Sequence, residues 1–178
     1  MAFYNLSEKG ISNILIQLGY KPPPDLLSRN LEYYLKRTSH GSTLSRLVYA
    51  DLAYRTMNYE LSWTLYQEAL CSDFQDIQGG TTREGIHLGV MTGTIVFLYK
   101  TYAGLNWVED LLSINPRLPE DLQEMSFRIR FRDESYYIGI TQEKVKVKLD
   151  SSNKKMILIN DKLVELIPEK WIETGLKR

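Results

Sequence analysis

Residues 37–45 read Arg37-Thr38-Ser39-His40-Gly41-Ser42-Thr43-Leu44-Ser45, and residues 73–88 read Asp73-Phe74-Gln75-Asp76-Ile77-Gln78-Gly79-Gly80-Thr81-Thr82-Arg83-Glu84-Gly85-Ile86-His87-Leu88. Both are polar, glycine-bearing loops, and each leads directly into a helical pattern. They enclose a predicted helical hairpin, and they contain both histidines of the chain. We therefore expect the chemistry of this protein in these two loops.

Helical periodicity extends over the N-terminal part of the chain. The predicted helices cover residues 7–18, 25–35, 44–55, 59–70 and 86–102. The first carries one apolar stripe, which consists of Ile11, Ile14, Leu15 and Leu18. In the last, Gly89 and Gly93 are expected to let another backbone approach closely, and Gly104 to end the helix. Helix pairs with loops at alternating ends suit a helical barrel or a solenoid.

The hydrophobic period changes from helical to alternating after about residue 113. Apolar residues alternate with arginines over residues 125–132 and with lysines over residues 144–149, which is typical of half-buried strands. We therefore predict a mixed two-domain chain, with an all-α part at residues 1–113 and a small antiparallel β-domain at residues 114–178.

Composition excludes several classes of function. The 178 residues include 22 basic and 22 acidic side chains, so no net field attracts nucleic acid or an anionic membrane. The single cysteine, Cys71, excludes an internal disulfide framework and suits a reducing cytoplasm. The longest apolar run, at residues 95–98, is too short to span a bilayer. We expect a cytoplasmic protein that binds neither nucleic acid nor membrane.

The first loop admits two interpretations. A Gly-Ser-Thr sequence that opens a helix presents backbone N–H groups and two hydroxyls beside the positive end of the helix dipole, which suits an oxyanion such as phosphate. Arg37 and His40 would add charge-assisted hydrogen bonds. Alternatively, Ser42 or Thr43 is an ordinary N-cap, which is the commoner use of these residues.

The second loop also has ordinary explanations. Thr81 and Glu84 have the spacing of a capping box. His87 is either a ligand-facing or a core histidine, and without a local carboxylate or thiol cluster it is a poor metal site. Asp73 and Asp76 fit a cleft wall or an exposed turn. No P-loop, paired zinc ligands or nucleophile elbow occurs, so no metal or cofactor is expected.

Taken together, the two loops resemble glycoside hydrolase family 65, which contains inverting phosphorylases and hydrolases of trehalose, maltose, kojibiose and related α-glucosides. The resemblance rests on residues 33–34, 37–45 and 76–89. It continues through residues 103–105 and 114–119, which look like the motifs that lead into the C-terminal β-domain of the family.

The resemblance covers only part of a family 65 enzyme, which has an N-terminal β-sandwich, an (α/α)6 barrel with the active site and a C-terminal β-sheet domain. This sequence resembles the last barrel helices and the C-terminal domain. The general-acid glutamate and a sugar-contacting Lys-Gln pair would lie upstream of Met1. We therefore expect no catalytic residue in this chain, and neither Glu84 nor Asp76 is a replacement acid.

The resemblance also implies roles for the two loops. Phosphate-binding positions are His40, Gly41, Ser42, Thr43 and His87, and the substrate-loop positions are Gln78, Gly79, Gly80, Thr81 and Glu84. Family hydrolases often carry an acidic residue where Gly41 stands, and a carboxylate there would repel phosphate. Gly41 therefore favours a phosphorylase that uses inorganic phosphate as co-substrate and forms glucose 1-phosphate.

Half a barrel would leave apolar helix faces bare, so we expect self-association or pairing with a complementary N-terminal chain. The expected ligands of the completed enzyme are a disaccharide and phosphate, and the chain alone is expected to be inactive. Two alternatives are a glycoside hydrolase fragment and a non-catalytic remnant that binds carbohydrate or protein.

Overall fold

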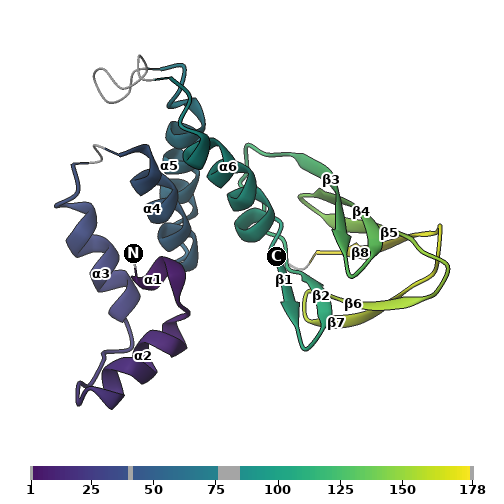
Figure 1. Cartoon of the computed structure of the whole chain (residues 1–178), viewed down its shortest axis with the longest axis horizontal. Helices are drawn as coiled ribbons and strands as arrows, with labels where there is room; N and C mark the ends of the chain where they lie inside the picture. The colour runs from purple at the N-terminus through teal and green to yellow at the C-terminus, as the bar shows by residue number, and fades with distance from the viewer. Residues whose placement is uncertain (1, 40–41, 76–84, 177–178) are drawn as a thin grey trace. The chain divides into compact units, whose positions relative to one another are not determined.

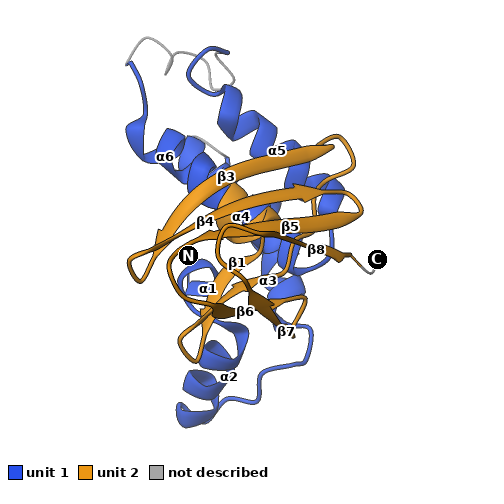
Figure 2. Cartoon of the chain, turned by 90° about the vertical axis from the view of Figure 1, so that its right-hand side faces the viewer, with its two compact units in different colours: residues 1–97 blue, residues 98–178 orange. Residues whose placement is uncertain are grey.

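The computed structural model describes residues 2–39, 42–75 and 85–176. It divides the chain into two compact units, Met1–Phe97 and Leu98–Arg178 (Figure 2). Helices make up the first unit, and small β-sheets dominate the second. The order of helices followed by a small β part agrees with the prediction, and the antiparallel pairing predicted for the β part has one exception, a parallel pair of strands. The predicted domain boundary at residues 113–114 stays a prediction.

The first unit contains helices α1 to α6 (Figure 1). Their bounds are Ala2–Asn5, Glu8–Gln17, Leu26–Leu35, Thr43–Arg55, Tyr59–Cys71 and Leu88–Phe97. Helices α2 to α5 confirm four of the predicted helices to within two residues. Helix α1 was not predicted, since four apolar residues at the start of the chain are too few to establish a period.

The caps of two helices follow from side-chain chemistry. The Ser7 hydroxyl accepts a hydrogen bond from the Gly10 amide at the start of α2. In the same way, the Asn58 side chain accepts one from the Leu61 amide at the start of α5. Each contact satisfies one of the amides that a helix N-terminus leaves unpaired.

Helix α4 is the centre of the first unit. Three of its residues, Val48, Leu52 and Ala53, form a buried cluster with Leu27 and Leu31 of α3. On the α5 side, the Arg46 guanidinium Nε lies 2.8 Å from the Glu68 carboxylate. Because α4 packs against α1, α3, α5 and α6, its position within the unit is fixed from several directions.

Helix α6 has no charged residue and packs against α4 and α5. The Phe97 ring stacks on Tyr66 of α5 with 5.2 Å between ring centroids. The close backbone approach expected at Gly89 and Gly93 is not found. Gly93 meets a side chain, that of Leu47, and a Cβ at position 89 would have nothing within 4 Å.

The second unit begins with a π-helical turn, η2 (Leu98–Tyr102), and contains two four-stranded sheets. The first sheet has the order β1-β2-β6-β7 and consists of Leu105–Val108, Leu111–Ile114, Lys155–Ile159 and Lys162–Leu166. The second has the order β3-β4-β5-β8 and consists of Glu124–Phe131, Glu134–Thr141, Lys144–Asp150 and Trp171–Gly175. All pairings are antiparallel except that of β2 with β6.

In the strands, apolar and polar residues alternate, and the apolar residues lie on the buried side of the sheet. In β5, Val145, Val147 and Leu149 are fully buried. In β3, Arg128 and Arg130 lie on the exposed side and pair with Asp150 and Asp133. These arginines therefore form the solvated side of a sheet, as the alternating pattern predicts.

The expectation of helix to about residue 113 was wrong for residues 105–113. This stretch forms the β1–β2 hairpin, in which Leu105 pairs with Ile114 and Val108 with Leu111. The two turn residues, Glu109 and Asp110, adopt positive φ angles of 45° and 76°, as a two-residue hairpin turn requires. Glycine and asparagine are the usual signals for such a turn, and neither is present here.

Candidate functional site

The first loop runs into the N-terminus of α4, and the structure describes this end of the loop from Ser42 onward. Ser42 occupies the N-cap position in an extended conformation, and its side chain makes no cap hydrogen bond. Its carbonyl accepts instead from the Ser45 amide at 3.1 Å and from the Ser45 hydroxyl at 2.6 Å. Thr43, the first helical residue, is buried. Ser42 is therefore at the position of a cap but does not use its hydroxyl as one.

The other phosphate-binding positions predicted in this loop, His40 and Gly41, lie outside the described residues. Arg37, which the sequence offers as an anion ligand, turns back on its own helix. Its Nη1 donates to the Tyr33 carbonyl at 3.0 Å, and its guanidinium carbon lies 3.8 Å from the centre of the Tyr33 ring.

His87 stands at the N-terminus of α6. Its carbonyl accepts hydrogen bonds from the Val90 amide at 2.9 Å and the Met91 amide at 3.0 Å, so it occupies the cap position of the helix. Its imidazole Nδ1 lies 2.7 Å from Asp73 Oδ1. Its backbone amide donates to the other carboxylate oxygen, Asp73 Oδ2, at 3.0 Å.

Sequence analysis does not predict this Asp73–His87 contact, because it finds no carboxylate cluster near His87 in the chain. The two residues are fourteen positions apart. A usable signal was present, because Asp73 follows the end of α5 and His87 precedes α6. Two consecutive helices that pack antiparallel bring such positions together.

The N-termini of α4 and α6 lie at the same end of the helical unit (Figure 1). Leu47, about one turn into α4, touches the position of Gly93, in the second turn of α6. Helix α5 runs the opposite way beside them. Ser42, Thr43 and His87 are thus brought to one end of the unit. This end offers helix N-terminal amides and an imidazole, a combination that suits an anion.

The predicted substrate loop lies outside the described residues, and so does the possible capping box. This holds for Gln78, Gly79, Gly80, Thr81 and Glu84. Those positions stay predictions.

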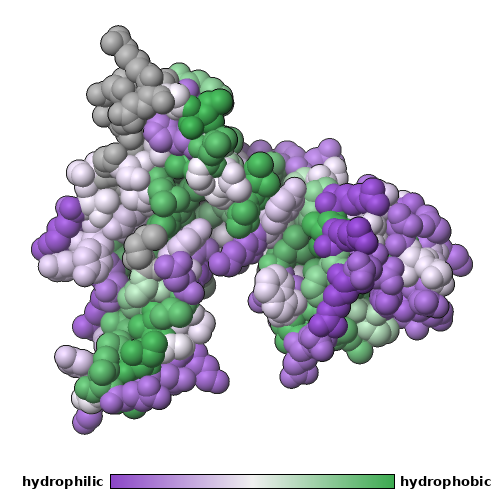
Figure 3. All heavy atoms as spheres, in the orientation of Figure 1, coloured by the Kyte–Doolittle hydropathy of each residue, from purple (hydrophilic) through white to green (hydrophobic). Residues whose placement is uncertain are grey.

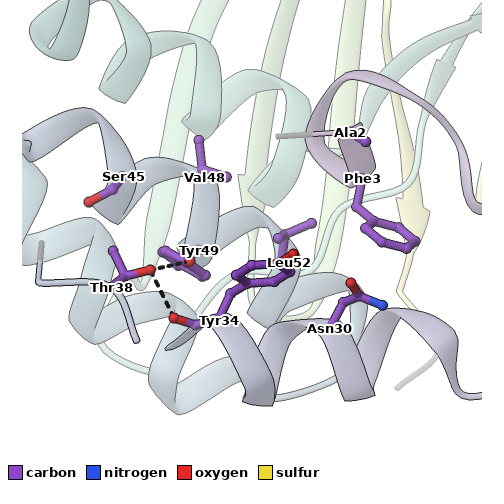
Figure 4. Close-up of a pocket in the computed structure, with 9 residues that line it drawn as sticks. All are labelled: Ala2, Phe3, Asn30, Tyr34, Thr38, Ser45, Val48, Tyr49 and Leu52. Carbon is purple, nitrogen blue, oxygen red and sulfur yellow. Dashed lines mark hydrogen bonds between the residues drawn. The ribbon is translucent and has the colours of Figure 1, made fainter. Parts of the chain in front are cut away.

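A pocket of about 380 Å³ lies between α1, α3 and α4 (Figure 4). Phe3, Tyr34 and Leu52 contribute to its largely apolar lining. At one side the Thr38 hydroxyl lies 2.5 Å from the Tyr49 hydroxyl and donates to the Tyr34 carbonyl at 2.8 Å. No local pattern in the sequence predicts this hollow, which exists only because three helices meet there.

Two kinds of feature are absent from the part of the chain that the structure describes. In residues 2–39, 42–75 and 85–176, no helix combines the length and the apolarity needed to cross a membrane. Over the same residues, no three histidine, cysteine, aspartate or glutamate side chains gather as a metal-ion site.

Two family models match the sequence in succession. The model of the glycosyl hydrolase family 65 central catalytic domain matches residues 1–96, and that of the family's C-terminal domain matches residues 105–166. Together they account for most of the chain.

Individual relatives agree with the family models. The chain is 39% identical over 132 residues to a trehalose 6-phosphate phosphorylase of Lactococcus lactis, a match that covers 74% of this chain and 17% of the relative. It is 32% identical over 117 residues to a maltose phosphorylase of Bacillus subtilis, covering 66% of this chain and 15% of the relative. The chain therefore spans about one sixth of the length of these relatives.

A solved structure shares the fold. It is a putative kojibiose phosphorylase from human microbiome, which matches with a TM-score of 0.74 at 22% identity. The match covers 92% of this chain and 24% of that structure.

Proposed function

This chain belongs to glycosyl hydrolase family 65, and from that membership we propose that it is the C-terminal part of an inverting disaccharide phosphorylase and supplies its phosphate-binding loop. The observation that carries the proposal is the gathering of the α4 and α6 N-termini at one end, with His87 held there by Asp73. The similarity to relatives named as phosphorylases adds support.

In this proposal, phosphate is bound by residues 40–43 at the start of α4 and by His87 at the start of α6. Helix N-terminal amides stabilise its charge and fix its position. Phosphate then attacks the anomeric carbon with inversion, while a glutamate outside this chain protonates the leaving oxygen. The product is glucose 1-phosphate. No residue of this chain is assigned the acid role, so the chain alone is expected to be inactive.

We further infer that the helices of the first unit are the last helices of an (α/α)6 barrel. Apolar residues gather over α2 (Figure 3), where Ile14, Ile16 and Leu18 are exposed. On α6, Leu88 and Ile95 are exposed as well, although a helix without charged residues is normally buried on all sides. Such faces require a cover. The proposed cover is the upstream part of a family 65 enzyme, and a second copy of the chain is the alternative.

The experiment measures release of glucose 1-phosphate from trehalose, trehalose 6-phosphate, maltose and kojibiose, with and without inorganic phosphate. The chain is tested alone and mixed with a separately produced upstream part of a family 65 phosphorylase. Phosphate-dependent release in the mixture alone is the expected result. Turnover by the isolated chain would overturn the assignment of the acid to a residue outside residues 1–178.

A matched variant separates phosphorolysis from hydrolysis. Gly41→Asp places a carboxylate in the phosphate loop, and like-charge repulsion is expected to raise the KM for phosphate by about tenfold or more in the mixture. Release of free glucose without phosphate by the unchanged chain would favour the hydrolase alternative. Disaccharide binding that is independent of phosphate, with no release in any mixture, would favour a non-catalytic remnant.

A further inference from the structure

We propose that Asp73 is a positioning residue of the anion site: it holds the His87 ring in one tautomer and one orientation, so that Nε2 is the nitrogen presented to the anion. This inference rests on the proposed function, because the anion is the phosphate co-substrate. It concerns a residue of the second loop to which no phosphate- or substrate-binding role was assigned above.

The Asp73 carboxylate is buried beside a partly exposed imidazole. The Asp73 side chain is 7% exposed, whereas that of His87 is 29% exposed. A carboxylate that is buried loses its hydrogen bonds to water, and hydrogen bonds from the protein must replace them. Asp73 makes two such contacts with His87, one to ring Nδ1 at 2.7 Å and one to the backbone amide at 3.0 Å. Two contacts from one carboxylate fix the ring relative to its own backbone.

The Asp73 contact also determines which ring nitrogen of His87 carries the hydrogen. An ionised carboxylate only accepts hydrogen bonds, so Nδ1 must carry the hydrogen in the contact with Oδ1. The hydrogen bond of one ring nitrogen determines the state of the other. Nε2 then accepts a hydrogen bond from a protonated phosphate oxygen when the ring is neutral, or donates one when the ring is charged. Loss of Asp73 removes the contact that sets the hydrogen on Nδ1.

A purely structural role is the competing explanation. The carboxylate accepts a hydrogen bond from the His87 amide at the start of α6 and interacts favourably with the helix dipole. Asp73 would make both interactions even if its only role were to cap α6. The two roles predict opposite changes in phosphate affinity when Asp73 is removed. Removal of a negative charge near the site should by itself tighten phosphate binding. Loss of a positioning residue should weaken it.

The first test reads the tautomer directly and needs no variant. Long-range ¹H–¹⁵N spectra of the full chain at about pH 8, above the usual titration range of histidine, resolve the two histidines, and His40→Gln assigns them. The expected state of His87 is the Nδ1–H tautomer. Predominance of the Nε2–H tautomer in the unchanged chain would overturn the proposal.

The second test compares phosphate binding by variants. Asp73→Ala removes both carboxylate oxygens that accept from His87. The variant is expected to lose the preference for the Nδ1–H tautomer and to bind inorganic phosphate about tenfold more weakly. Asp73→Glu keeps a carboxylate and should recover part of both losses. The control is Asp25→Ala, which removes an exposed carboxylate paired with Arg29 at the start of α3 and should change neither reading.

The outcomes separate this inference from the function on which it rests. Equal or tighter phosphate binding by a folded Asp73→Ala chain would leave Asp73 as a cap only and overturn the positioning role. If the unchanged chain binds no phosphate, alone or in the complemented mixture, the proposed phosphate-binding function is wrong. The tautomer spectra still report in that case whether Asp73 fixes the His87 ring. Thermal unfolding identifies a variant that fails to fold. If Asp73→Ala does so, phosphate binding by Asp73→Glu and the His87 tautomer of the unchanged chain test the proposal.

Discussion

Gly93 of α6 lies directly against Leu47 of α4, and a Cβ at position 93 would come within 2.7 Å of Leu47 Cδ1. Leu47 is 1% exposed, so its methyl group has little room to move in a close-packed interior. The missing side chain at position 93 therefore allows α6 to pack on α4. This packing brings His87 to the same end of the unit as Thr43.

We predict that Gly93→Val destabilises the helical unit by about 2 kcal/mol, because the added methyl groups must displace Leu47. Gly89→Ala is the control in the same helix, since a Cβ at position 89 would have nothing within 4 Å. It should be neutral or stabilise by up to about 1 kcal/mol through helix propensity. Urea unfolding followed by helical circular dichroism measures both. Equal stability of the two variants would contradict the packing argument.

Gly104 is predicted to be the least replaceable described glycine of the second unit. Its φ is +60°, and a Cβ there would come within 2.0 Å of the Asn115 carbonyl oxygen, a backbone atom that cannot rotate away. Gly104→Ala should cost at least about 3 kcal/mol through backbone strain and overpacking. Gly175→Ala, with open space and no positive φ, should cost far less. Amide hydrogen exchange of the β-sheets, compared between the two variants, tests this difference.

Local pattern was sufficient for much of the fold. Helices α2 to α5 carry an apolar period and recognisable ends, such as Ser7 and Asn58, and β3 and β5 alternate cleanly. These signals lie within a few residues of the elements that they define. Sequence alone was therefore able to predict their type and approximate bounds.

Features that depend on distant or atypical residues were missed. The β1–β2 hairpin turns through Glu109 and Asp110, which adopt the left-handed conformation without the usual glycine. The Asp73–His87 contact forms only after two helices pack, since the residues belong to no common local motif. Parallel pairing of β2 with β6 joins segments more than forty residues apart, which no local period reveals.

Tyr66 should make the helical unit sensitive to alkali. Burial raises the pKa of Tyr66 to about 12, and the side chain is 3% exposed between Trp63 and Phe97. Because the folded-state pKa is above the unfolded value of about 10, the stabilisation is complete below pH 10 and is lost as the pH rises through 12. At pH 11 the loss is about 1 kcal/mol.

The test is Tyr66→Phe, which removes the ionisable hydroxyl and keeps the ring. The free energy of unfolding of the unchanged chain should fall by about 1 kcal/mol more than that of the variant between about pH 8 and pH 11. Tyr20→Phe, at an exposed position, is the control and should follow the unchanged chain. Parallel pH profiles of the unchanged chain and Tyr66→Phe would show that burial of Tyr66 has no such effect.

The apolar stripe of α2 gives the sharpest test of the proposed complementary partner. Of its predicted members only Ile11 is buried, whereas Ile14 is 46% and Leu18 66% exposed. The double variant Ile14→Lys, Leu18→Lys changes two exposed positions, one in α2 and one at its C-cap, and lysine is a good helix former, so the isolated chain should keep its stability to within about 0.5 kcal/mol. Two charges at a docked apolar face should nevertheless weaken assembly with the upstream part by about tenfold or more.

The matched control is Asn13→Lys, Gln17→Lys, which adds the same charge at two exposed polar positions outside the predicted apolar stripe. Titration of the upstream part against each variant, with release of glucose 1-phosphate as the readout, gives the concentration for half-maximal activity. Only the variant on the apolar stripe should shift that concentration. Equal shifts for both would point to net charge, and no shift for either would mean that the α2 stripe is not the surface on which the upstream part docks.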